Sequence, residues 1–225
     1  MKKIIAIIFL VSLGLYAQDF MPLKPLGEYK SSDYNLKDGV EYLEIRTYFG
    51  QAKSVQEVYN ETTYKKEIAI HAKSYSSLDE DISANIKAMK PNLKDSDIRK
   101  HRMCRFMGCN FRISVAVVLF ADKNITTLNK VSDVTAMLGK IDTSAELKLV
   151  LWLNDINKNL TDHKHSESYK KVKNGYEVIS VYENSVMNFG ECGAFKHKLF
   201  MNNDGKIEKK ILLEKIEKDD CVVAD

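Results

Sequence analysis

Two histidines stand two residues apart in a polar part of the chain. His163 and His165 are preceded by Asp162 and followed by Glu167. In an extended segment, residues i and i+2 point to the same side, so the two imidazoles could bind one transition-metal ion. No third histidine lies nearby in the sequence, and short polar clusters of this kind are commonly loops. His163 and His165 are thus the metal candidates, but the sequence predicts no cofactor.

The second candidate chemistry belongs to four cysteines, Cys104, Cys109, Cys192 and Cys221. An even number of cysteines in an exported chain is typical of disulfide bonding. Three pairings are possible, and the favoured one joins Cys104 to Cys109 across a short loop and Cys192 to Cys221 across a C-terminal hairpin.

The second of these bonds has a geometric difficulty. A hairpin turning at 204–205 places Cys192 opposite Glu217, four residues from Cys221. That offset is about 13 Å along a strand, more than the Cα separation that a disulfide tolerates. The bond would therefore need a bulge or a reversal near residues 218–220.

No local motif of a known catalytic type is present. The chain has neither a Gly-x-Ser-x-Gly elbow, nor a His-Glu-x-x-His helix, nor a glycine-rich phosphate loop. We therefore expect a non-catalytic protein that binds a partner protein or a small ligand in the concavity of a bent sheet. The alternative is a hydrolase whose site joins residues distant in sequence, with His163, His165 or His197 as candidate base.

Two further features bear on binding and modification. Five aromatic residues in the C-terminal half could line a binding surface, although core packing is the commoner role for such residues: Trp152, Tyr176, Tyr182, Phe195 and Phe200. Asp122, Asn124 and Thr126 match an acidic bacterial N-glycosylation sequon, but an ordinary loop with a cap near Asn124 or Thr126 is the preferred interpretation.

The first residues predict export. Lys2 and Lys3 precede an apolar run over 4–15, and the polar Gln18 and Asp19 follow. This is typical of a secretory signal peptide, and the run is shorter than the roughly 20 residues that span a bilayer. Residues 1–17 are predicted to be removed after Ala17. The mature protein is then expected to be periplasmic or secreted from a bacterium, with no stable membrane anchor.

Composition narrows the range of partners. The chain carries a formal net charge of +3, and 29% of its residues are charged, with both signs interspersed. Nucleic-acid binding normally needs a basic stripe or patch, so no nucleic acid is predicted as a partner.

The pattern of apolar residues predicts an α+β fold in which a curved antiparallel sheet of about seven strands packs against two or three helices. We expect an extended N-terminal arm over 18–38, then a single globular domain over 39–225. Alternation predicts strands over 40–49 and 64–73, paired antiparallel, and over 147–153. A capping box at Ser77 and Glu80 predicts a helix that ends before Pro91. Two more helices are predicted over 96–103 and 128–138, and Gly139 is expected to end the second of them in a left-handed cap. The apolar run 111–121 predicts a central strand. A loop is predicted over 154–174. Strands are predicted over 176–183, 194–201 and 206–216, and an Asp-Gly turn is expected to join the last two.

Overall fold

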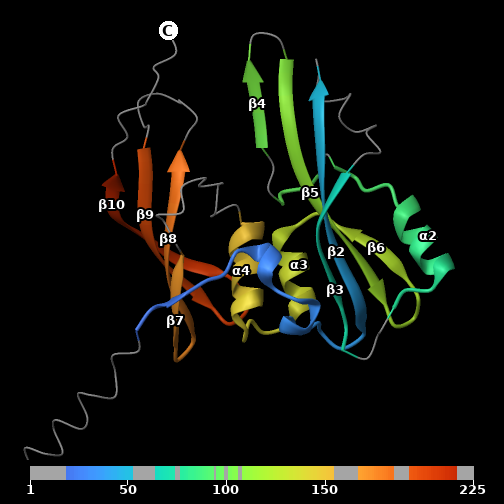
Figure 1. Cartoon of the computed structure of the whole chain (residues 1–225), viewed down its shortest axis with the longest axis horizontal. Helices are drawn as coiled ribbons and strands as arrows, with labels where there is room; N and C mark the ends of the chain where they lie inside the picture. The colour runs from blue at the N-terminus through green and yellow to red at the C-terminus, as the bar shows by residue number, and fades with distance from the viewer. Residues whose placement is uncertain are drawn as a thin grey trace, which may run out of the picture.

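Two antiparallel sheets and three α-helices make up the regular structure of the described part of the chain (Figure 1). The structure is a computed structural model, and it describes residues 19–52, 64–73, 77–93, 95–98, 101–105, 108–154, 167–184 and 193–216. The predicted α+β class is confirmed. A single curved sheet of about seven strands is not what forms, because two helices separate the strands into two sheets.

The first sheet, called sheet B, is formed by strands from the N-terminal half in the order β3-β2-β5-β4, with β6 pairing to β5 as well. Its strands are β2 (Val40–Ala52), β3 (Tyr64–His71), β4 (His101–Arg105), β5 (Gly108–Phe120) and β6 (Ile125–Leu128). The predicted antiparallel pairing of the first two strands is confirmed. The predicted central strand is also confirmed, because β5 pairs along its length with β2 and is buried on both faces from Ile113 to Leu119.

The second sheet, called sheet A, has the order β1-β7-β8-β9-β10. Its strands are β1 (Met21–Pro22), β7 (Ser168–Val172), β8 (Gly175–Asn184), β9 (Gly193–Asn202) and β10 (Ile207–Ile216). The predicted hairpin is confirmed, with β9 and β10 joined across the Asp-Gly turn. The prediction of a loop throughout 154–174 is wrong at its end, where β7 forms and pairs with β8.

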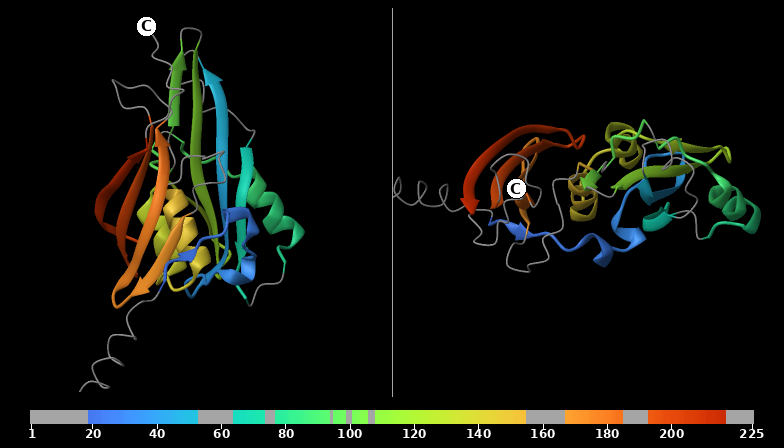
Figure 2. Two further views of the ribbon diagram at one scale, coloured as in Figure 1. Left: turned by 60° about the vertical axis from the view of Figure 1, so that its left-hand side comes forward. Right: turned by 90° about the horizontal axis from the view of Figure 1, so that it is seen from above.

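Helices α3 (Val131–Leu138) and α4 (Ser144–Leu153) lie between the two sheets (Figures 1 and 2). The predicted strand over 147–153 is therefore wrong: these residues are helical. Thr143 accepts a hydrogen bond from the backbone N–H of Glu146, and the Glu146 carboxylate accepts one from the N–H of Thr143, which fixes the start of α4. Sheets on both sides bury α4 almost all round, so its leucines alternate without revealing a helical period.

A continuous apolar core extends through these layers. It includes Leu43 and Ile45 of sheet B, Leu149 of α4, and Val178 and Leu199 of sheet A, all 0% exposed. The outer face of sheet B has a smaller apolar cluster, in which Ile82 and Ile86 of α2 (Glu80–Ala88) pack against the sheet. The layers therefore run sheet A, α3 with α4, sheet B, and α2.

Three local predictions need correction. Asp79, not Ser77, caps α2, because its carboxylate accepts the N–H of Ile82 at 2.7 Å. The predicted helix over 96–103 does not form, because Ser96 hydrogen-bonds to Ser114 of β5 and β4 follows at His101. Gly139 ends α3 at a φ of 70°, as expected, but its ψ of −129° lies outside the left-handed helical region.

The N-terminal arm contacts the rest of the fold through two short 3-10 helices, η1 (Leu26–Glu28) and η2 (Ser31–Asp33). Leu23 and Tyr34 of the arm are buried in the main core. The backbone N–H of Asn35 donates to the Glu146 carboxylate at 2.6 Å, which connects the arm to the start of α4. No helix in the described part of the chain is both long and apolar enough to cross a membrane.

Candidate functional site

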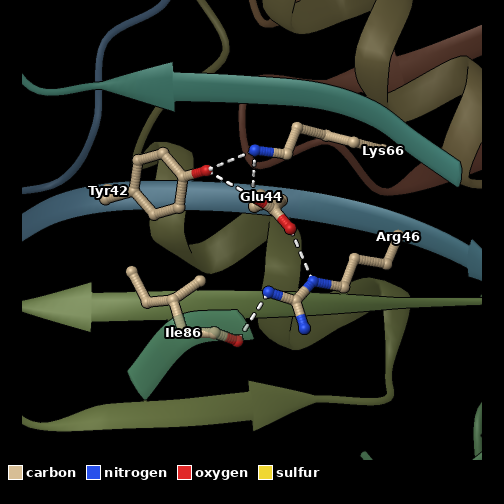
Figure 3. Close-up of polar contacts among 5 residues, drawn as sticks. All are labelled: Tyr42, Glu44, Arg46, Lys66 and Ile86. Atoms are coloured by element: carbon tan, nitrogen blue, oxygen red, sulfur yellow. Dashed lines mark hydrogen bonds and ion pairs between the residues drawn. The ribbon is translucent and has the colours of Figure 1, made fainter. Parts of the chain in front are cut away.

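A row of polar side chains lies buried between β2 and α2 (Figure 3). Tyr42, Glu44 and Arg46 alternate along β2, so all three point to the face that α2 covers. Glu44 and Arg46 are 1% and 0% exposed. Arg46 Nε donates to Glu44 Oε1 at 2.5 Å, and the Tyr42 hydroxyl donates to Glu44 Oε2.

Contacts from three other residues complete this polar cluster. Lys66 Nζ of β3 lies 2.8 Å from Glu44 Oε2, while its side chain is 51% exposed. Arg46 Nη2 donates to the carbonyl of Ile86, near the C-terminal end of α2, at 2.7 Å. The guanidinium carbon lies 4.3 Å from the centroid of the Tyr64 ring. The C-terminal end of a helix carries a partial negative charge, and a nearby cation is attracted to it. Arg46 therefore holds α2 on the sheet.

The surroundings keep this cluster ionised. Burial alone would raise the pKa of Glu44, but hydrogen bonds from Lys66, Tyr42 and Arg46 together lower it. Burial alone would lower the pKa of Arg46, but Glu44 offsets this and the pKa is raised. Burial and the hydrogen bond to Glu44 raise the pKa of Tyr42, so its hydroxyl keeps its proton. Glu44 and Arg46 therefore stay charged while Tyr42 stays neutral, and the hydrogen bond from Arg46 to the Ile86 carbonyl positions α2 on the sheet.

A second polar cluster lies between α4 and sheet A. Lys148 of α4 forms an ion pair with Glu167, and the Ser180 hydroxyl donates to Glu167 Oε1 at 3.4 Å. His197 of β9 is directly opposite Ser180 of β8 in the ladder, and burial, together with Lys210, lowers the pKa of its imidazole. All four residues are 7% exposed or less. The sequence-predicted candidate base His197 thus lies next to a serine and near a carboxylate, but in the interior.

The outer face of sheet A, away from α4, carries lysines and phenylalanines, and we call it the lysine–phenylalanine face. Glu177 of β8 forms ion pairs with Lys198 at 2.7 Å and Lys170 at 3.1 Å. The ammonium groups of Lys198 and Lys209 lie 5.2 and 6.0 Å from the Phe200 ring centroid, and that of Lys170 lies 5.4 Å from the Phe20 centroid. No described helix covers this face (Figure 2).

The charges of this face are only partly compensated. Hydrogen bonds from Lys198 and Lys170, of which the Lys198 contribution is the larger, lower the pKa of Glu177. The Glu177 carboxylate thus pairs with two ammonium groups, and Glu214 of β10 lies 3.9 Å from Lys196 Nζ, while the ammonium group of Lys209 lies beside the Phe200 ring. Ammonium groups beside aromatic faces suit a ligand that offers both negative charge and apolar surface.

Of the four cysteines and the two metal candidates, only Cys104 and Cys109 lie within the described residues. The backbone of Cys104 lies directly opposite that of Cys109 in the β4–β5 ladder, with Arg105 opposite Gly108 next to them. Cys192, Cys221, His163 and His165 lie outside the described residues. Within the described ranges, no three His, Cys, Asp or Glu side chains gather as metal ligands would.

The sequence-predicted aromatic residues separate by location. Tyr176 is buried in the main core, Phe195 is buried on the inner side of β9, and Trp152 is half-buried on α4. Phe200 lies on the lysine–phenylalanine face, whereas the side chain of Tyr182 lies outside the described part. Asn124 is exposed in the turn between β5 and β6, where its N–H donates to the Asp122 carboxylate.

Sequence reasoning missed the cluster at Glu44 and Arg46. It treated 40–49 as a half-buried strand, because charged residues alternate with apolar ones. The signal available was the apolar stripe of the next helix, which needs a sheet face to cover.

No protein-family model matches the chain, and no curated protein and no solved structure is similar to it.

Proposed function

We propose that this is an exported bacterial protein, periplasmic or secreted, that binds a partner protein or small ligand and is not an enzyme. The lysine–phenylalanine face is the observation that carries the proposal. α4 packs on the other face of sheet A and α2 packs on the outer face of sheet B, whereas no described helix lies on this face, which combines ammonium groups with aromatic rings. Such a face would bind an anionic partner that also presents apolar groups.

Binding is tested by titrating the ¹⁵N-labelled protein with a polyglutamate peptide that ends in tryptophan. We expect amide shifts to concentrate on the outer-face residues of β7, β8 and β9, and to weaken as salt is added. Lys198→Glu and Phe200→Ala should each weaken binding several-fold, whereas Lys87→Glu on α2 should not. Shifts that map to another surface, or equal affinity in all variants, would refute the role of this face.

Export is tested separately, by cell fractionation and by intact mass. The mature chain is expected to begin at Gln18 and to lie outside the cytoplasm. A stable cytoplasmic form that retains residues 1–17 would contradict the proposal. The same mass measurement, made with and without reduction before alkylation, counts the disulfides.

The cysteine pair on β4 and β5 gives that count a specific expectation. Directly opposite residues of an antiparallel ladder have Cα atoms about 4.5 or 5.5 Å apart, and both values suit a disulfide. We therefore expect a peptide in which Cys104 is bonded to Cys109. Free thiols at both positions in freshly isolated protein would rule it out.

A hydrolase is the alternative, and the cluster of Lys148, Glu167, Ser180 and His197 is the reason to keep it. A serine opposite a histidine and bonded to a carboxylate has the composition of a nucleophile with its base. Because all four side chains are buried, such a site would have to open before a substrate could reach Ser180. Turnover of p-nitrophenyl acetate that Ser180→Ala and His197→Ala both abolish would favour the enzyme over the binding protein.

A further inference from the structure

β10 is an edge strand whose exposed side is unusually apolar. It terminates sheet A, and within the described residues its ladder partner is β9 alone. Its other side therefore presents backbone groups that a further strand could pair with. Leu212 and Leu213 of this strand are 53% and 49% exposed, the highest values among the exposed large apolar side chains of the described chain.

An irregularity in β10 places two opposite charges on one face. Lys209 lies opposite Phe200, Ile211 opposite Lys198, and Glu214 opposite Lys196. In a regular strand, Lys209 and Glu214 would point to opposite faces, because an odd number of positions separates them. The register shift between Leu212 and Glu214 leaves Leu213 without a partner on β9. Lys209, Ile211 and Glu214 consequently share the outer face.

This arrangement is complementary to itself. When two copies of β10 run antiparallel about a two-fold axis at Ile211, Ile211 faces its own equivalent. Lys210 of each copy then lies opposite Leu212 of the other, and Lys209 of each lies opposite Glu214 of the other, with Leu213 again outside the register. Every opposed pair lies on one face of the sheet, as antiparallel pairing requires.

We propose that β10 pairs with β10 of a second copy in this register, so that two copies of sheet A form one continuous sheet in a symmetric homodimer. Lysines on an edge strand ordinarily discourage pairing. Here each Lys209 meets the carboxylate of Glu214, which within one chain has only a long contact of 3.9 Å to the half-exposed Lys196, and the stem of Lys210 can cover Leu212. The interface is isologous, so it closes at two copies instead of continuing into a fibre. The inference goes beyond the proposed binding role and does not depend on it.

The test uses the full exported chain, and it measures molar mass by light scattering during size-exclusion chromatography. We expect the mass of two chains for the wild type. In the Lys209→Glu variant, residue 209 of each copy places a glutamate opposite Glu214 of the other. In the Glu214→Lys variant, residue 214 of each copy places a lysine opposite Lys209 of the other. Each variant should therefore elute with the mass of one chain. The double variant Lys209→Glu, Glu214→Lys restores both pairs and should return to the mass of two.

Mixing gives the sharpest outcome. Equal amounts of the two single variants should combine into a dimer with one chain of each kind, because each supplies the charge that the other lacks. Lys90→Glu, the same charge change at an exposed residue after α2, should leave the dimer intact, and circular dichroism should show that all variants fold. A monomeric wild type, or a dimer that both single variants preserve, would overturn the inference.

Discussion

At the scale of single residues, Glu44 and Arg46 form the most deeply buried ion pair of the described chain. Both side chains are withdrawn from water, and their charges are tolerated because each has several partners. A buried pair of this kind is not by itself a source of net stability, but losing Arg46 would leave the buried Glu44 carboxylate with the half-exposed Lys66 as its cationic partner.

Arg46→Met is therefore expected to destabilise the protein by about 3 kcal/mol. The change leaves the Glu44 carboxylate buried and removes the donor to the Ile86 carbonyl. Urea unfolding at neutral pH measures the effect. Lys65→Met is the matched control, since the Lys65 side chain is 65% exposed in its pair with Glu67 and should cost at most about 1 kcal/mol. Equal losses in the two variants would contradict the argument.

The pH dependence of stability follows from the same carboxylate. The folded protein holds the pKa of Glu44 below its ordinary value of 4.5. The unfolded state therefore takes up this proton first as the pH falls, and the stabilisation present above pH 4.5 is lost below it. Free energies of unfolding for the wild type and Glu44→Gln should differ most near neutral pH and converge in acid. Parallel curves for the two proteins would show that Glu44 is not the group responsible.

At the scale of elements, the turn between β7 and β8 depends on one glycine. Gly175 has a φ of 147°, and a Cβ atom added there would lie 2.0 Å from the carbonyl oxygen of Met201. That contact is with backbone of the neighbouring strand, so it cannot be relieved by a rotamer change.

Gly175→Ala should consequently destabilise the protein by at least about 2 kcal/mol, through both the clash and the backbone conformation. Thermal unfolding followed by circular dichroism measures the change. Gly27→Ala provides the comparison, because nothing lies within 4 Å of its added Cβ and its φ is not positive. If the Gly175→Ala and Gly27→Ala proteins unfold at the same temperature, sheet A must relax easily at this turn.

The elements also show how far the sequence alone can reach. Alternation correctly predicted β2 and β3, because each is a long strand with a regular change of side-chain type. The same rule failed at 147–153, where Leu147, Leu149, Leu151 and Leu153 alternate inside a helix. A helix buried between two sheets has no polar face to set its period. The capping box at Thr143 and Glu146 was the local signal that could have corrected the assignment.

The candidate site was harder to predict than the fold, for a related reason. Glu44 and Arg46 are buried because α2 returns to cover β2 from a distant part of the sequence. Local patterns describe which face of a strand is polar, but not whether another element will cover it. The lysine–phenylalanine face likewise depends on the register of β7 to β10, which brings Lys170, Glu177 and Lys198 together.

At the scale of the whole molecule, the main core extends from sheet B through α4 to sheet A without interruption. The turn between β9 and β10 adds a further connection, because Asn203 accepts the N–H of Ile141 at 2.6 Å and Gly205 lies against Thr135 of α3. Neither sheet has a separate core of comparable extent in the described residues.

We therefore expect residues 39–225 to unfold as one cooperative unit together with the N-terminal arm, because Leu23 and Tyr34 of the arm lie in this core. Far-ultraviolet circular dichroism reports both sheets, whereas the fluorescence of Trp152, the only tryptophan of the chain, reports α4. The two urea transitions should coincide in midpoint and slope. Separate transitions would indicate that sheet A and sheet B are independent domains.

The long ladder between β2 and β5 has a consequence for how the chain reaches its native state. Val40 pairs with Phe120 and Ala52 with Cys109, so β2 leaves the ribosome well before its main partner is synthesised. Pairings this remote in sequence form slowly, because a large loop must close before the contacts form. The precursor, as proposed, has to enter a translocation channel as an unfolded polypeptide. Slow pairing of β2 with β5 would keep it unfolded until translocation begins.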